Sequence, residues 1–221
     1  MKVKKIKKSI LIIGLGKFGR YLALKMQDFG NQVMVVDKEE AESQKLATKI
    51  DDLFIGDCTN EEVLKSLGVT DFDICFVTIG ENFESSITIT MLLKKLGAKY
   101  TVVKTGSELQ SELLRKIGAD EIIYPEKELA EKLALKYHTG QSMKSYLELN
   151  KDYSIIEMEV PQKWIGSSLM ELDLRKKFGL NIIAIKNSNS VNVVPEPVES
   201  FREGDVIVVV GQHSTILKYI S

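Results

Sequence analysis

The sequence has few of the residues on which metal sites, disulfide frameworks and histidine-based active sites depend. Its 221 residues include two cysteines, Cys58 and Cys75, and two histidines, His138 and His213. The cysteines lack the paired spacing of zinc ligands, which fits a reducing compartment and small buried side chains. Neither histidine has an evident acidic partner, and a nucleophile elbow and a Walker lysine are both missing. These absences make an enzyme the less favoured interpretation.

Long apolar runs and a surplus of one charge are also missing. Lys and Arg total 30 against 31 Asp and Glu, and this balance gives no reason to expect nucleic acid as a partner. No apolar run nears the roughly 18 residues that cross a bilayer, so a membrane role is expected to come through a partner. Five lysines among residues 1–8 precede the first apolar run. We expect a solvated tail there rather than a signal peptide, with a weak contact to an anionic membrane surface or an acidic partner as the alternative.

The motif that organises the chain lies in residues 9–37. An apolar run breaks at Gly14, Gly16 and Gly19, an amphipathic segment follows, and a second apolar run ends in Asp37. In this pattern the first glycine permits a tight turn, the second lets a pyrophosphate approach the backbone, and the third lets helix and strand pack closely. The amides at the helix start favour phosphate, and Asp37 stands near the spacing at which a carboxylate binds ribose. The motif predicts a nucleotide site; a glycine-rich turn without a ligand is the alternative.

Strands and helices alternate from the motif to residue 137. This alternation predicts an α/β fold with a Rossmann-like, doubly wound parallel sheet of six strands. The expected strands are 10–13, 33–36, 53–55, 73–79, 100–104 and 121–124, and the expected helices are 18–29, 39–49, 60–67, 84–96, 108–117 and 129–137.

Ligands of such sheets bind at the carboxyl ends of the strands, where Gly14, Asp37, Asp57, Thr78 and Lys104 are predicted to meet. Two of the polar positions at this edge leave alternatives open. Asp57 or Thr59 is expected to cap the next helix, to touch a nucleotide base, or to do both. Glu126 is either part of a favourable acidic first turn or a ligand for a cation or a neighbouring subunit.

The pattern changes near residue 150 to that of a small α+β unit. Expected strands are 154–160, 181–186, 191–194 and 206–210, with helices at 170–178, closed by Gly179, and at 214–220. A unit of about 70 residues is marginal alone, so we expect its strands to dock in a dimer. We therefore divide the chain into a nucleotide-binding domain (1–125), a crossover helix and linker (126–150) and a regulatory domain (151–221).

Five motifs together resemble the Ktr/Trk family of bacterial potassium uptake subunits. They are IGLGKFG at 13–19, VD at 36–37, GDCT at 56–59, IGEN at 79–82 and IGADEIIYPEK at 117–127. The resemblance implies an RCK N-lobe (TrkA-N), a crossover helix and an RCK C-lobe (TrkA-C). It also implies a homodimer that assembles into an octameric ring under a membrane potassium channel subunit. The location implied is cytoplasmic, peripheral to the inner face of the membrane through that partner.

The resemblance also implies ATP and ADP as ligands of the N-lobe. Gly14, Gly16 and Gly19 would hold the phosphates, Asp37 the ribose, and Asp57 with Cys58 the adenine side. Lys104 and Glu126 match positions near the phosphates, and Glu126 would help to bind a divalent or monovalent cation. Lys17 replaces an arginine of many members by a point charge, which bears on how sharply ATP and ADP are distinguished. The other expected contacts are Phe18, Lys38, Thr78, Ile79 and Gly80.

For the C-lobe the resemblance implies cyclic di-AMP at the dimer interface. The matching segment is 172–183, where Arg175 would meet a phosphate, and Asn181 and Ile182 would contact the ligand. The remaining expected contacts are Leu174, Ile183 and Pro195 (or Pro197). A cation that complements a helix C-terminus is the alternative for Arg175.

The predicted function is that of a nucleotide-gated regulatory subunit in which ATP and cyclic di-AMP bias one ring transition in opposite directions. Two alternatives stay open at this stage. One is an NAD(H)-binding redox sensor or small oxidoreductase on the same fold. The other is a structural ring with a vestigial nucleotide site.

Overall fold

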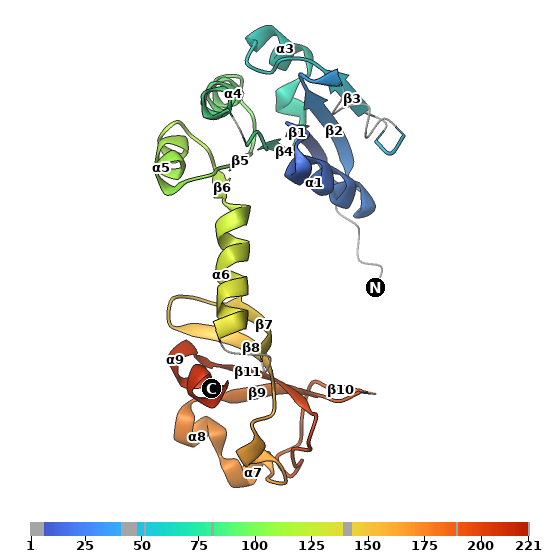
Figure 1. Ribbon diagram of the computed structural model, residues 1–221. Helices are drawn as coiled ribbons and strands as arrows, with labels where there is room; N and C mark the ends of the chain where they lie inside the picture. Colours follow the sequence, from blue (N-terminus) through green and yellow to red (C-terminus); the bar gives the residue numbers. More distant parts are fainter. Residues whose placement is uncertain are drawn as a thin grey trace. The chain divides into compact units, whose positions relative to one another are not determined.

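The computed structural model describes residues 7–40, 48–50, 52–80, 82–138, 143–188 and 190–220. The chain forms two compact units, Met1–Glu126 and Lys127–Ser221 (Figure 1). Among the described helices, none combines the length and the apolar character needed to cross a membrane.

The first unit is built on a six-stranded parallel sheet in the order β3-β2-β1-β4-β5-β6. This order and the helical connections confirm the predicted Rossmann-like, doubly wound fold. Its elements are β1 (Ser9–Ile13), α1 (Lys17–Asp28), β2 (Gln32–Asp37), β3 (Asp52–Ile55), α3 (Glu61–Ser66), β4 (Ile74–Val77), α4 (Phe83–Lys95), β5 (Thr101–Lys104), α5 (Glu108–Lys116) and β6 (Glu121–Ile123).

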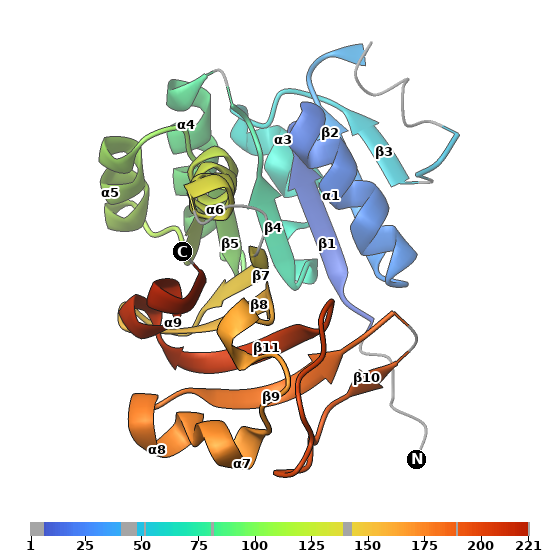
Figure 2. The same cartoon turned by 60° about the horizontal axis from the view of Figure 1, so that its bottom comes forward.

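Both faces of this sheet are buried, which explains why its strands read as continuous apolar runs. Side chains of β1 alternate between the faces: Ile10 packs in one core with Ala23 of α1, and Leu11 packs in the other with Leu64 of α3. Buried residues of α4 and α5 join the second core. Figure 2 shows α1 lying along β1 and β2. The packing fixes the carboxyl ends of the strands at one edge, where the candidate site lies.

The second unit carries an antiparallel sheet in the order β10-β9-β11-β8-β7, and with its helices it matches the predicted α+β C-lobe (Figure 2). Its core holds Trp164, Phe201 and Ile207. Its elements, with the helix that leads into it, are α6 (Pro125–His138), β7 (Met143–Glu148), β8 (Tyr153–Glu159), α7 (Leu169–Leu172), α8 (Leu174–Phe178), β9 (Asn181–Lys186), β10 (Val191–Asn192), β11 (Val206–Gln212) and α9 (His213–Ile220).

Most of the helix expected at 39–49 lies outside the described residues. Two other helices differ from the prediction by more than one residue. The helix expected at 170–178 is two short helices, because Asp173 has φ 46° and interrupts the helical backbone. Helix α6 begins at Pro125, four residues earlier than expected, since proline suits a first helical position where no amide is needed.

Two strands also differ from the prediction. Met143–Glu148, within the stretch expected to connect the two units, forms β7 and pairs with β8. The strand expected at 191–194 ends at Asn192, because the side-chain oxygen of Asn192 accepts the Val194 amide and turns the chain.

Candidate functional site

A cleft of about 760 Å³ opens at the carboxyl ends of the parallel strands. Of the N-terminal site residues predicted from the sequence, all but Gly19 line it: Gly14, Gly16, Lys17, Phe18, Asp37, Lys38, Asp57, Cys58, Thr78, Ile79, Gly80, Lys104 and Glu126. Gly19 lies behind the cleft wall, packed against the glycine loop. The sheet thus gathers residues that are up to 112 positions apart (126 − 14) in the chain. Their roles in binding remain predictions.

The loop 14–16 turns at the end of β1 and presents the start of α1 to the cleft. Gly14 has φ 100°, a backbone conformation that only glycine adopts without strain. A methyl group built at Gly16 meets no atom within 4 Å, so this position faces open cleft space. Among the described residues, no side chain caps α1 and its first turn holds no acidic residue. The first amides of α1 are therefore available to an anion.

Asp37 ties the glycine loop to the end of β2. Its Oδ2 accepts the Leu15 amide at 2.5 Å, and its Oδ1 accepts the Glu39 amide at 2.9 Å. Each carboxylate oxygen keeps further acceptor capacity. The same side chain can therefore position the loop and accept hydrogen bonds from the hydroxyls of a ribose.

Thr78 ties the loop to the end of β4 on its other side. Its hydroxyl donates to the Gly14 carbonyl at 2.6 Å, and it is 3% exposed. The hydroxyl also lies 3.1 Å from the Ile13 carbonyl, which accepts the Thr78 amide at 2.8 Å. A hydroxyl has one proton, and the shorter contact assigns it to Gly14. Thr78 lines the cleft, but its hydrogen-bonding capacity goes to the loop. Its geometry is that of a residue that positions the phosphate-binding amides.

Thr78→Val is therefore expected to weaken phosphate-bearing ligands selectively. Valine keeps the shape but leaves the Gly14 carbonyl without its donor, a change that costs about 1–3 kcal/mol at a buried group. We expect ADP affinity to fall about tenfold on this basis, while adenosine affinity stays within twofold. Calorimetric titration with each ligand measures the ratio of ADP affinity to adenosine affinity. Thr78→Ser keeps the hydroxyl and should restore the ratio of the unsubstituted chain. Equal losses for adenosine and ADP would contradict the positioning role.

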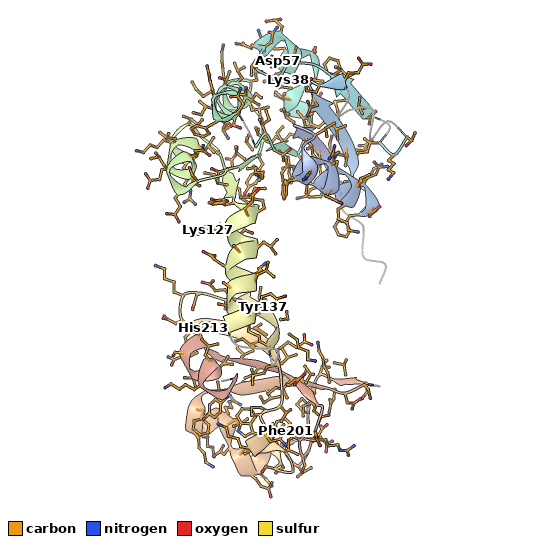
Figure 3. All side chains as sticks on the ribbon, in the orientation of Figure 1. Lys38, Asp57, Lys127, Tyr137, Phe201 and His213 are labelled. Carbon is orange, nitrogen blue, oxygen red and sulfur yellow. The ribbon has the colours of Figure 1, made fainter. Side chains whose placement is uncertain are left out.

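The turn after β3 corrects one prediction. Neither Asp57 nor Thr59 caps α3; Asn60 does, by accepting the Glu62 amide. Asp57 instead accepts the amide and the hydroxyl of Thr59, and these bonds hold the pKa of its carboxyl below the usual range. Figure 3 shows Lys38 near Asp57, and its charge favours the same ionised form. Asp57 therefore offers a carboxylate at this end of the cleft.

Cys58 forms an apolar part of the wall beside Asp57. It is 3% exposed, and burial raises the pKa of its thiol to about 12. The thiol is therefore neutral at physiological pH and not a nucleophile. Buried Cys75 is likewise a core residue, as predicted for both cysteines.

At the opposite end, Lys104 and Glu126 form an ion pair of 2.8 Å. The Lys104 side chain is 11% exposed, whereas that of Glu126 is 62% exposed. The Lys104 ammonium holds the pKa of Glu126 below its usual range, so the carboxyl is ionised at neutral pH. Over the part of the chain that the structure describes, no group of three or more metal-ligating side chains occurs. A cation at Glu126 would need most of its oxygen ligands from a nucleotide or a second copy.

Sequence reasoning missed several residues that also line the cleft, among them Arg20, Gly56 and Asn82. Arg20 lies one turn after Lys17 on α1, and this spacing is the signal that could have identified it. Gly56 directly follows β3 and opens the turn that leads to Asp57. Asn82 caps α4 by accepting the Ser85 amide, so the start of a second helix also borders the cleft.

The residues predicted for a second ligand lie around α8 and β9. Arg175 is exposed on α8, Asn181 and Ile182 begin β9, and Ile183 stands at the irregular register between β9 and β11. Pro195 follows β10 and is half-buried. Leu174 is 4% exposed and packs in the core of the second unit, so its side chain is covered in the single chain.

Comparison with known proteins agrees with this architecture. The model of the TrkA-N domain matches residues 10–125, and that of the TrkA-C domain matches residues 154–221. Ktr system potassium uptake protein C of Bacillus subtilis (strain 168) is 36% identical over 214 residues, 97% of this chain and 96% of the relative. Protein A of the same system in Vibrio alginolyticus is 31% identical and covers 92% of each chain.

Solved structures share the fold. A structure described as GsuK Channel has a TM-score of 0.68 at 20% identity and covers 99% of this chain, which spans 40% of that chain. At this identity the likeness concerns the fold alone. The two domain matches and the full-length relatives are decisive for the family. This chain belongs to the Ktr/Trk family of potassium uptake proteins, built from a TrkA-N and a TrkA-C domain.

Proposed function

We propose that this chain is the cytoplasmic, nucleotide-gated regulatory subunit of a potassium uptake system. The observation that carries the proposal is the cleft itself. It combines helix amides without a side-chain cap, a ribose-type carboxylate and a mostly covered lysine in a chain whose relatives are potassium uptake proteins along almost their whole length. The chain would act at the inner face of the membrane through a membrane-spanning potassium channel subunit. A binding role, rather than catalysis, suits a cleft whose described lining contains no histidine.

ATP and ADP are the proposed ligands of the cleft. Lys17, Arg20, Lys38 and Lys104 line it, a set of cations that suits a chain of phosphates. Asp37 would hold the ribose and Asp57 the adenine side, as the order of strands along the sheet edge allows. The γ-phosphate would favour the active geometry of the assembly and ADP the inactive one.

The proposed assembly is a homodimer that builds an octameric ring. Its support here is an apolar stripe on α6: Leu129, Leu133 and Tyr137 follow one another at four-residue steps and are 58%, 43% and 77% exposed. Such a stripe suits burial against a second copy. A divalent or monovalent cation near Glu126 could then be completed by oxygen ligands from neighbouring nucleotides.

Cyclic di-AMP is the proposed ligand of the second unit, at a dimer interface formed by 172–183 and Pro195. Exposed Arg175 supplies a cation for a phosphate, and β9 supplies backbone and apolar contacts. Bound there, the ligand would bias the ring against the effect of ATP. Linkage then requires each ligand to change the affinity of the other by the same factor.

Calorimetric titration of the full chain with ATP, ADP, NADH and cyclic di-AMP tests these assignments. We expect ATP and ADP to compete for one site and cyclic di-AMP to bind at a separate one. Potassium flux through liposomes that hold the chain with its membrane subunit should rise with ATP over ADP. Binding of none of the adenine compounds would refute the proposal.

NAD(H) is the second candidate ligand, because a carboxylate at the position of Asp37 suits the adenosine ribose of a dinucleotide equally well. A structure titled GsuK channel bound to NAD, with a TM-score of 0.64 at 19% identity, has the same fold. Displacement of bound ADP by NADH at lower concentrations than by ATP would favour this redox-sensing function.

A further inference from the structure

The feature from which we argue is the ion pair between Lys104 and Glu126 at one end of the cleft. Both residues line the cleft, and their charged atoms are 2.8 Å apart. The Lys104 side chain is 11% exposed, and its ammonium pairs with the Glu126 carboxylate, which offsets the cost of holding a charge in a mostly covered place. The carboxylate is mostly exposed and can be solvated when it leaves. The pair is thus asymmetric: Glu126 can give up its partner more easily than Lys104 can.

The place of the pair along the sheet edge fixes which part of a ligand meets it. Asp57 follows β3, Asp37 ends β2, the glycine loop follows β1, and Lys104 ends β5 two strands further on. Neighbouring strands are about 4.8 Å apart. The Lys104 ammonium reaches back toward the loop, since a methyl group built at Gly80, after β4, would lie 3.6 Å from Nζ. A phosphate chain that begins at the loop therefore meets Lys104 only as it grows longer.

We propose that Glu126 is a built-in competitor for Lys104 and makes the cleft select its ligand by the length of the phosphate chain. A ligand that stops at the loop leaves the ion pair intact. A longer one must take the ammonium from Glu126, and the released carboxylate then stands beside the new negative charge. This inference rests on the proposed function and assigns to Glu126 a specificity-determining role.

The exchange acts at the beginning of α6. Glu126 is the second residue of that helix, whose residues from Lys127 onward belong to the second unit. A nucleotide that displaces Glu126 removes the ion pair that ties the first turn of α6 to β5. A ligand with a short phosphate chain would leave this ion pair in place, and a ligand with a longer chain would break it.

Titration of Glu126→Gln with AMP, ADP and ATP tests the competition. The full chain is used in buffer with EDTA, so that no divalent cation bridges ligand and carboxylate. We expect AMP affinity to stay within twofold and ATP affinity to rise about tenfold, with ADP between them. Lys104→Met should remove the preference for ATP over AMP. Glu128→Gln makes the same charge change on the same first turn of α6, outside the residues that line the cleft, and should leave all three affinities unchanged.

The outcomes separate this inference from the proposed function. Absence of nucleotide binding to the unsubstituted chain would remove the proposed function itself. A second outcome is that the unsubstituted chain binds normally and Glu126→Gln raises the affinities for AMP and ATP by the same factor. The loss of one negative charge near the cleft would then explain the gain, and the competition would be overturned. Weaker ATP binding by Glu126→Gln would overturn it as well, because the carboxylate would then be supporting the ligand.

Discussion

Gly19→Ala is expected to lower the free energy of unfolding by about 3 kcal/mol, at the upper end of what overpacking costs, and to abolish nucleotide binding. A methyl group at this position would overlap the Gly14 carbonyl oxygen and stand 2.6 Å from the Thr78 hydroxyl. The first obstacle is backbone and cannot rotate away, so α1 must move off the sheet. Urea unfolding and ADP titration of the same preparation measure both effects.

Gly16→Ala is the matched control for that substitution. A methyl group at Gly16 meets no atom within 4 Å, and its φ of −56° suits alanine. We expect the free energy of unfolding to change by less than about 1 kcal/mol, the usual cost of alanine at a helix N-cap. ADP affinity should nevertheless fall at least tenfold, because the methyl group occupies the space through which the phosphates approach. Equal destabilisation by the two substitutions would contradict the assigned roles of the two glycines.

Much of the first unit could be predicted because its signals are local. Apolar runs punctuated by turns place the strands, and parallel pairing then brings the residue after each strand to one edge. This reasoning needs no side-chain geometry, which is why it anticipated that Asp37, Asp57 and Lys104 would line one cleft. It fails where several neighbouring polar residues could take one role, as when Asn60 rather than Asp57 or Thr59 caps α3.

Other features of the site depend on tertiary contacts that no sequence pattern records. Nothing local to Thr78 indicates that its hydroxyl is used by Gly14, 64 residues earlier. The pairing of Lys104 with Glu126 depends on how α6 begins, and the acidic first turn conceals it. In the second unit, the sequence does not predict the helix break at Asp173. An aspartate can either continue a helix or adopt the left-handed conformation that ends one.

Asp37→Ala is expected to produce the largest loss of affinity among substitutions that preserve the fold. The carboxylate accepts the Leu15 and Glu39 amides and is the proposed acceptor for the ribose hydroxyls. Because a hydrogen bond to a charged group contributes about 1.5–3 kcal/mol, loss of the ribose contacts alone should weaken ATP and ADP about 100-fold. Loss of the tether on Leu15 should also lower the free energy of unfolding by about 2 kcal/mol.

Two further variants separate the tether from the ribose contact. Asp28→Ala removes the same charge from an exposed side chain near the end of α1, where its partner is Lys25, and should change neither affinity nor stability. Asp37→Asn keeps one oxygen that can accept the Leu15 amide, so most of the stability should return while affinity stays low. If Asp37→Asn bound ADP as well as the unsubstituted chain does, Asp37 would be a loop tether only. The ribose would then need another acceptor, and Asp57 is the nearest candidate along the strand order.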